Sequence, residues 1–188
     1  MMMTVPQVVS LAGWSLFTLY WSAAAKNAAP ATSSESRNSR RVHELLVNLA
    51  LLLAVVPMPG LGQPLLPHPS FVVWAGLGIQ TASGALGIWA RRHLGSNWSG
   101  EITIKVDHRM VRSGPYRFVR HPIYTAMLGM FFGTALVFGG RHAVLGFAMA
   151  AFAYRRKIRL EEANLRTAFG PAYEVYRRDT WALVPGLL

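Results

Sequence analysis

Residues 111–124 read VRSGPYRFVRHPIY, a basic loop that runs directly into an apolar helix. A Gly-Pro pair predicts a turn within this loop. Pro122 suits the first turn of a helix, where its missing N–H is not needed, so we expect His121 near the N-cap. His121 and Tyr124 lie three residues apart and should share one helix face. Lipid-facing sequence does not tolerate so many His, Arg and Tyr residues, so we expect any chemistry at this junction.

The composition is that of a membrane-embedded domain. Of the 188 residues, 52% are hydrophobic and 14% are charged, and the mean hydropathy is +0.28. Soluble globular chains carry more charge, so we interpret residues 1–188 as a single integral membrane domain. The chain contains no cysteine, which excludes disulfides, thiolate metal sites and cysteine nucleophiles. We predict no metal site.

Apolar runs predict an all-α, polytopic membrane protein with five transmembrane helices. A run of about 20 residues, at ~1.5 Å per residue, crosses the ~30 Å hydrocarbon core of a bilayer. The first run could be a cleaved signal peptide, but no Lys or Arg precedes it and it exceeds a typical signal core, so we interpret it as an anchor. The last two runs should form a C-terminal helical hairpin, followed by a cytosolic helical tail. The predicted spans are residues 5–25, 42–58, 70–90, 121–138 and 142–160.

The segments outside these runs have distinct compositions. Residues 26–41 are polar and lack hydrophobic periodicity, so we expect a mobile loop. Residues 57–69 hold five prolines and should turn on the far side of the membrane. Residues 154–188 read as one charged helix with an apolar end, which should lie in the membrane interface or fold back over the site. In the third run, small residues should let neighbouring helices approach closely; they are Gly76, Gly78, Ser83, Gly84 and Gly87.

Charge placement orients the protein. The chain has 19 Lys and Arg residues and a net charge of +11, and with five spans every basic residue except Arg141 falls on one face. The positive-inside rule makes this face cytosolic, which places the N-terminus outside and the C-terminus and active site in the cytosol. Orientation and contact with anionic lipid explain the charge, so we expect membrane lipids as partners and no nucleic acid.

A second cluster follows the last span. Glu161 and Glu162 are neighbours on a helix and point about 100° apart, so they cannot both address one atom. One could face a cationic ligand while the other pairs with a neighbouring base such as Arg159 or Lys157. A solvated helix face with ion pairs is the alternative here, and contact with lipid headgroups is the alternative for the first cluster. A ligand with an anionic and a cationic end, such as S-adenosylmethionine, would use both clusters, although composition cannot select it over other cofactors.

Three stretches together resemble the isoprenylcysteine carboxyl methyltransferase family. They are DHRMVRS at 107–113, GPYRFVRHPIY at 114–124 and RLEEANLRTAFGPAYEVYRR at 159–178. They are more distantly similar to the membrane phospholipid methyltransferases. The resemblance covers roughly residues 91–185 and implies an integral membrane enzyme that binds S-adenosylmethionine on its cytosolic side without a Rossmann fold.

The activity implied by this resemblance is carboxyl O-methylation of an isoprenylcysteine-like, lipophilic acceptor that enters from the bilayer. Three other functions stay open at this point. They are N-methylation of a phospholipid amine, an NADPH-dependent reduction like that of the membrane sterol reductases, and a non-enzymatic role as a lipid-binding anchor.

The resemblance also implies site residues in the half of the chain from 91 to 188. The cofactor pocket should be lined by His108, Tyr116, Arg120, His121, Tyr124, Glu161 and Glu162. The catalytic candidates are Arg159, Arg156 and Glu162. We favour Arg159 because it lies three residues before Glu162 and so shares its helix face. A carboxylate acceptor is already ionised near neutral pH, so we expect an arginine to orient it and no base to be required.

Overall fold

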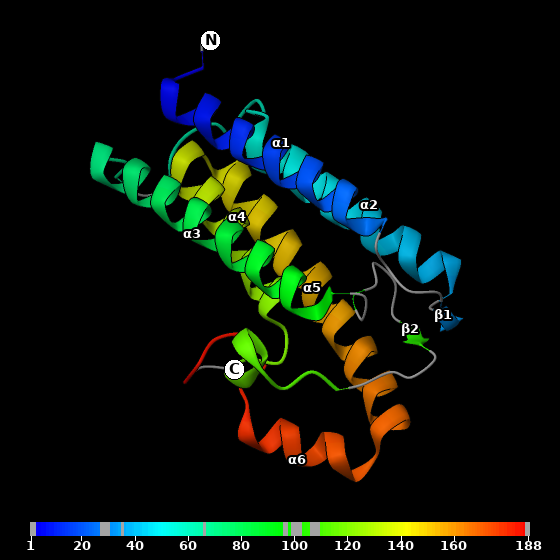
Figure 1. Ribbon diagram of the computed structural model, residues 1–188. Helices are drawn as coiled ribbons and strands as arrows, with labels where there is room; N and C mark the ends of the chain where they lie inside the picture. Colours follow the sequence, from blue (N-terminus) through cyan, green and yellow to red (C-terminus); the bar gives the residue numbers. More distant parts are fainter. Residues whose placement is uncertain are drawn as a thin grey trace.

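Helices α1 to α5 run alongside one another, and α6 lies beyond one end of them (Figure 1). The computed structural model describes residues 3–26, 31–34, 36–65, 67–95, 98, 103–105 and 110–186. The elements are α1 (Val5–Ala25), β1 (Ala31–Ser34), α2 (Arg37–Val55), α3 (Ser70–Leu94), β2 (Thr103–Lys105), the 3-10 helix η2 (Gly114–Arg117), α4 (Pro122–Phe138), α5 (Arg141–Phe169) and α6 (Pro171–Asp179). The chain is therefore helical, as predicted, apart from a small antiparallel sheet of β1 and β2.

The predicted loop over residues 26–41 is wrong for β1 and for the first turn of α2. Helix α2 begins at Arg37 instead of residue 42, because the side chain of Ser36 accepts a hydrogen bond from the backbone N–H of Ser39 and caps the helix. It ends at Val55, two residues before the first of the prolines that cannot continue a helix. Helix α1 has the predicted bounds.

The single charged helix predicted from residue 154 onward is also wrong. Gly170 has a φ of +52°, a left-handed conformation that disfavours other residue types, and it ends α5. Pro171 then starts α6 at a position where its missing N–H is not needed. The chain consequently changes direction at Gly170, and α6 and the segment after it return toward the start of α4 (Figure 1).

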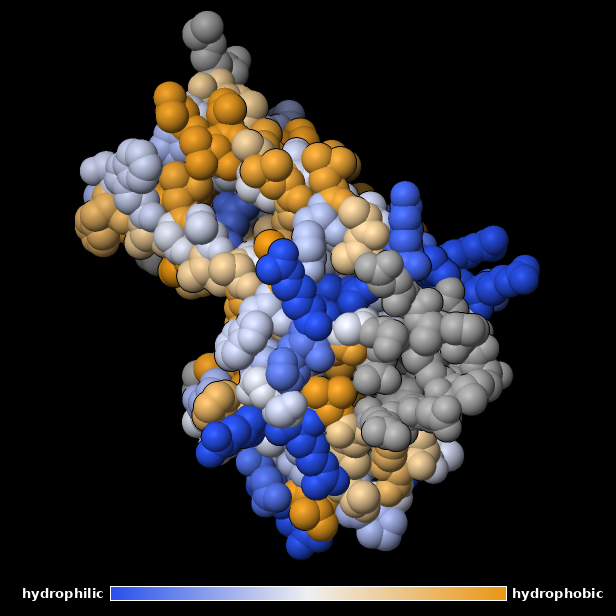
Figure 2. All heavy atoms as spheres, viewed as in Figure 1, coloured by the Kyte–Doolittle hydropathy of each residue, from blue (hydrophilic) through white to orange (hydrophobic). Residues whose placement is uncertain are grey.

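The outer surface of the bundle is apolar over α1 to α3. Within the described residues, α1 and α3 are long and apolar enough to cross a membrane, and α4 is apolar but shorter. Large side chains such as Leu16, Leu19 and Trp74 face outward. Figure 2 shows hydrophobic residues over the end of the molecule near the N-terminus and hydrophilic residues toward the other end. Apolar surface of this extent is typical of a protein covered by lipid or by a partner.

Close contact between α3 and α4 depends on glycines. A Cβ atom at Gly133 would lie 2.5 Å from the backbone oxygen of Gly76, so only glycine allows this approach. The predicted packing role of Gly76 is therefore confirmed. Gly78 has no atom within 4 Å of such a Cβ, so the same prediction is wrong there.

Polar and small residues also join α1 to α4 and α5 to α2. The indole Nε1 of Trp14 on α1 donates a hydrogen bond of 2.9 Å to Oγ1 of Thr134 on α4. On the other side, a Cβ at Gly146 of α5 would lie 2.6 Å from the oxygen of Ala50 on α2. The second contact holds α5 against α2 and so fixes the helix that carries the two glutamates.

Candidate functional site

The candidate site lies where the start of α4 meets the middle of α5. His121 is the N-cap residue of α4, as predicted, and it is 5% exposed. The backbone N–H groups of Arg120 and His121 donate to the oxygens of Trp181 (2.8 Å) and Ala182 (3.1 Å). Of the two predicted positions for the end of the chain, the structure shows the one in which it folds back over the site.

Glu161 is the acceptor for α4 side chains. The hydroxyl of Tyr124 donates to its Oε2 at 2.7 Å, and Nδ1 of His121 lies 3.8 Å from the same oxygen. The rings of His121 and Tyr124 are stacked, with centroids 5.5 Å apart and planes 15° apart. The predicted shared face of these two residues is confirmed, and both rings rest beside one carboxylate.

Glu162 is surrounded by positive charge. Nε of Arg120 donates to its Oε1 at 3.1 Å, Nε2 of His121 lies 3.4 Å from that oxygen, and Arg166 and Arg177 each place a nitrogen 3.8 Å from Oε2. Burial alone would raise the pKa of this carboxyl, but the hydrogen bonds and charges of His121 and Arg120 outweigh burial and lower the pKa to about 2. Glu162 is therefore ionised at neutral pH.

The two glutamates diverge as predicted, because they approach different nitrogens of His121. Their basic partners were predicted less well. The expected neighbour Arg159 forms no pair with Glu162 in the described structure, whereas Arg120 reaches it from 42 residues away in the sequence. No local spacing rule could have indicated this contact.

Tyr116 lies in η2, close to the same carboxylates. Its side chain is buried, and its backbone oxygen accepts a 2.7 Å hydrogen bond from the hydroxyl of Tyr176 on α6. The hydroxyl of Tyr116 itself has no hydrogen-bond partner among the described residues. Burial raises the pKa of this hydroxyl, and the negative charge of Glu161 raises it further, so the group is neutral and able to donate.

Two other predicted residues, Arg156 and Arg159, lie on α5, and neither pairs with a member of this cluster within the described part of the chain. Arg156 donates to Ser39 at the start of α2, to its backbone oxygen at 3.3 Å and to Oγ at 2.7 Å. Arg159 is exposed on α5. His108 lies outside the described residues.

Sequence reasoning missed Tyr154, whose ring packs on that of Tyr124 with centroids 5.4 Å apart. The signal was available, because Tyr154 lies two helical turns before Glu161 and therefore on the same face of α5. The site accordingly has an aromatic wall contributed by α4 and α5 together.

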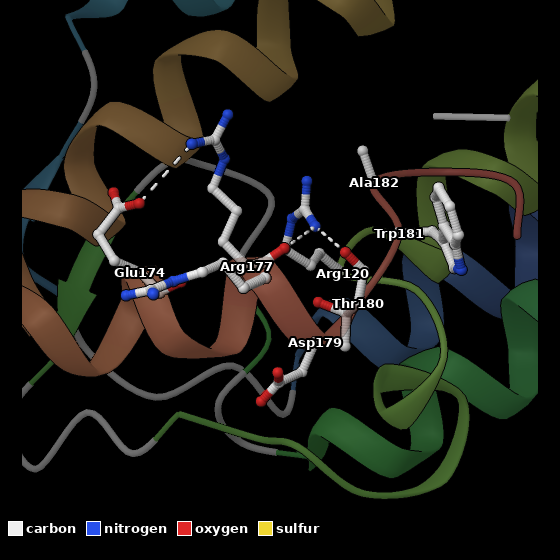
Figure 3. A pocket seen from close by; sticks show the side chains of 8 residues that line it. Arg120, Glu174, Arg177, Asp179, Thr180, Trp181 and Ala182 are labelled. Carbon is white, nitrogen blue, oxygen red and sulfur yellow. Dashed lines mark hydrogen bonds and ion pairs between the residues drawn. The ribbon is translucent and has the colours of Figure 1, made fainter. Parts of the chain in front are cut away.

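An open pocket of about 480 Å³ adjoins the site on the side of α6 (Figure 3). Nη1 of Arg120 donates to the backbone oxygens of Arg177 (3.0 Å) and Thr180 at the end of α6. Arg120 therefore connects Glu162 to the end of α6 and also lines this pocket. The other lining residues are Glu174, Arg177, Arg178, Asp179, Thr180, Trp181 and Ala182.

The fold and the site define a helical protein whose outer surface is apolar, as in proteins that contact lipid. Its candidate site, with carboxylates and aromatic rings, lies at one end of the bundle. The partly exposed carboxylate of Glu161 beside the stacked rings of His121 and Tyr124 suits a ligand that carries positive charge and a planar group.

Comparison with known proteins shows which family part of this chain resembles. Residues 77–167 match the model of the isoprenylcysteine carboxyl methyltransferase family. The predicted resemblance is therefore confirmed. The matched region contains every predicted site residue, and the family and the apolar helices together indicate a membrane protein.

Two proteins are similar to this part of the chain. A protein-S-isoprenylcysteine O-methyltransferase of Dictyostelium discoideum is 29% identical over 82 residues, which are 43% of this chain and 35% of that protein. A protein of the same name from Schizosaccharomyces pombe is 34% identical over 80 residues, which are 42% of this chain and 34% of that protein. The similar segment thus spans about a third of each relative.

Proposed function

We propose that this chain transfers a methyl group from S-adenosylmethionine to the carboxylate of an isoprenylcysteine-like, lipophilic acceptor at a membrane surface. The observation that carries the proposal is the arrangement of His121 and Tyr124 around Glu161 in the region that matches the methyltransferase family. The names of the two similar proteins supply the acceptor class.

The residues of the site fit this methyl donor. The hydroxyl of Tyr116 is buried without a protein partner among the described residues, and the side chain of Glu161 is 31% exposed, so its carboxylate can receive a cationic group. Tyr116, His121, Tyr124 and Glu161 would hold the donor. When bound, it supplies an electrophilic methyl group.

Glu162 acts as a fixed negative charge in this proposal. With a pKa of about 2 it remains ionised near neutral pH, so it is a poor proton acceptor or donor there. A carboxylate acceptor requires no base, whereas an amine must first lose a proton. Glu162 is therefore unsuited to be the base that N-methylation of a lipid amine would require.

In this proposal the protein accelerates the reaction mainly by orienting the acceptor and excluding water. We assign the orienting role to Arg159. It is exposed on α5 close to the glutamates, and within the described part of the chain no hydrogen bond or ion pair occupies it. Arg156 is the weaker candidate because Ser39 binds its guanidinium.

We further propose that α1 to α5 all cross the membrane and that the end with α6 faces the cytosol. The outward apolar side chains of the bundle and the hydrophilic character of the other end support this placement (Figure 2). An acceptor with a lipid chain would then reach the site from the bilayer.

Calorimetric binding of S-adenosylmethionine to the detergent-purified protein tests the function. We expect saturable binding by the wild type and its loss in His121→Ala and in the double variant Glu161→Gln/Glu162→Gln, with helicity retained. Transfer of a labelled methyl group to a prenylated N-acetylcysteine, but not to phosphatidylethanolamine, should accompany it. Binding of NADPH without binding of S-adenosylmethionine would refute the proposal.

A further inference from the structure

Helix α3 changes from apolar to basic near its C-terminal end. Trp89 is 50% exposed, and residues 91–93, which read RRH, form the last turn of the helix. The guanidinium carbon of Arg92 lies 5.9 Å from the centre of the Tyr20 ring on α1. Aromatic residues beside arginines are typical of the membrane–water interface of a spanning helix. We call the position of this change along the bundle the boundary level.

The 3-10 helix η2 is held at the boundary level by contacts with the end of α3. Nε2 of His93 lies 2.8 Å from Oγ of Ser113, within hydrogen-bond distance. A Cβ atom at Gly114 would lie 2.7 Å from Cε1 of His93, so the backbone of η2 packs directly on this ring. Figure 1 shows η2 beside the C-terminal part of α3. Phe118, which follows η2 directly, is therefore placed close to the boundary level.

Two large aromatic side chains are exposed at this place. Phe118 is 58% exposed and Trp181 is 48% exposed. The backbone N–H of Trp181 donates to the oxygen of Phe118 at 3.2 Å, so the segment after α6 brings Trp181 to the boundary level too. Figure 3 shows the Trp181 ring at the far end of the pocket from Glu174. Removal of exposed aromatic surface from water is favourable, and tryptophan is enriched where one end of its ring is apolar and the other is wet.

Positive charge accompanies these rings. Arg117 is exposed, and its guanidinium carbon lies 5.7 Å from the centre of the Phe118 ring. Arg92 is exposed at the same level on α3. Lipid headgroups carry phosphates, which attract arginine, and acyl chains begin directly beneath them. The aromatic rings and the arginines together therefore match the chemistry of a bilayer surface.

We propose that Phe118 and Trp181 form a membrane-docking surface, outside the spanning helices, that inserts into the headgroup region of the bilayer. This inference rests on the membrane placement given with the proposed function. The backbone N–H groups of Arg120 and His121 donate to the oxygens of Trp181 and Ala182. Docking of Trp181 therefore holds the segment that covers the site at the depth where a lipophilic acceptor would enter.

The absence of cysteine from the chain makes a depth measurement direct, because one introduced cysteine carries the only label. The variants Phe118→Cys and Trp181→Cys are each given a nitroxide label and reconstituted into vesicles of phosphatidylcholine and phosphatidylglycerol. Oxygen, which concentrates in the bilayer, and a water-soluble nickel complex serve as paramagnetic relaxants. We expect both labels to be relaxed more strongly by oxygen, and less by the nickel complex, than a label in water.

Two further variants supply the references for lipid and water. Leu16→Cys lies on the outer surface of α1 and is expected in lipid, whereas Val175→Cys lies on an exposed position of α6 and is expected in water. If the label at 118 or 181 behaves like that at 175 while the label at 16 lies in lipid, the docking surface is refuted and the membrane placement stands. Shielding of these labels from both relaxants would indicate contact with protein and would also overturn the inference. A water-exposed label at 16 would instead refute the membrane placement itself, and this inference with it.

Discussion

Glu162→Gln should make the stability of this protein less sensitive to acid. In the folded protein the pKa of Glu162 is about 2, against an ordinary value of 4.5. A carboxyl whose folded-state pKa is depressed stabilises the protein above its unfolded-state pKa, and this contribution disappears as the pH falls through the folded-state value. The relevant window therefore runs from about pH 4.5 down to about pH 2.

The magnitude follows from the two pKa values. Their difference corresponds to about 3 kcal/mol of stability when Glu162 is fully ionised, which applies because its side chain is only 12% exposed. Linkage predicts that about 2 kcal/mol of this is lost between pH 6 and pH 3. Glutamine cannot ionise, so the variant lacks this contribution to stability at both pH values.

Equilibrium unfolding in detergent at pH 6 and pH 3 measures the effect as the difference in unfolding free energy between wild type and Glu162→Gln. Glu174→Gln is the control, because Glu174 pairs with Arg166 on the surface and is 42% exposed. Surface pairs are worth about 0–1 kcal/mol, so its difference from the wild type should be small at both pH values. A wild-type advantage over Glu162→Gln that is equal at pH 6 and pH 3 would refute the reasoning.

Two further substitutions test the site and the bundle. Tyr124→Phe removes the 2.7 Å hydrogen bond to Glu161 and should weaken S-adenosylmethionine binding about tenfold in calorimetry. The circular dichroism spectrum should stay unchanged. Undiminished affinity would show that this hydroxyl has no part in binding. Gly133→Ala places a methyl group against Gly76 and should destabilise the protein by about 1–3 kcal/mol in thermal unfolding. Gly78→Ala is the control, because this residue faces open space on α3 and the substitution should be neutral or stabilising. Equal melting temperatures for the two variants would contradict the glycine contact.

Features set by neighbouring residues could be predicted from the sequence. The N-cap position of His121 follows from Pro122, and the shared face of His121 and Tyr124 follows from helix geometry. The divergence of Glu161 and Glu162 has the same origin. Each of these needed only the 3.6-residue period of a helix.

Contacts between distant segments could not be predicted. Arg120 pairs with Glu162 because α4 and α5 are packed together, and Arg156 is bound to Ser39 because α2 lies along α5. The break at Gly170 is different, since a Gly-Pro pair is a recognisable helix end and start. The helix break was therefore predictable from neighbouring residues alone.

The backbone bonds from Arg120 and His121 to residues 181 and 182 also have a consequence for biosynthesis. Ribosomes make a chain from its N-terminus, so α1 to α3 can form before any of the candidate cofactor contacts exists. The loop before α4 acquires these two bonds only after the segment beyond α6 has left the ribosome. A nascent chain stalled at the end of α5 would thus carry both glutamates on a helix and still lack a finished site.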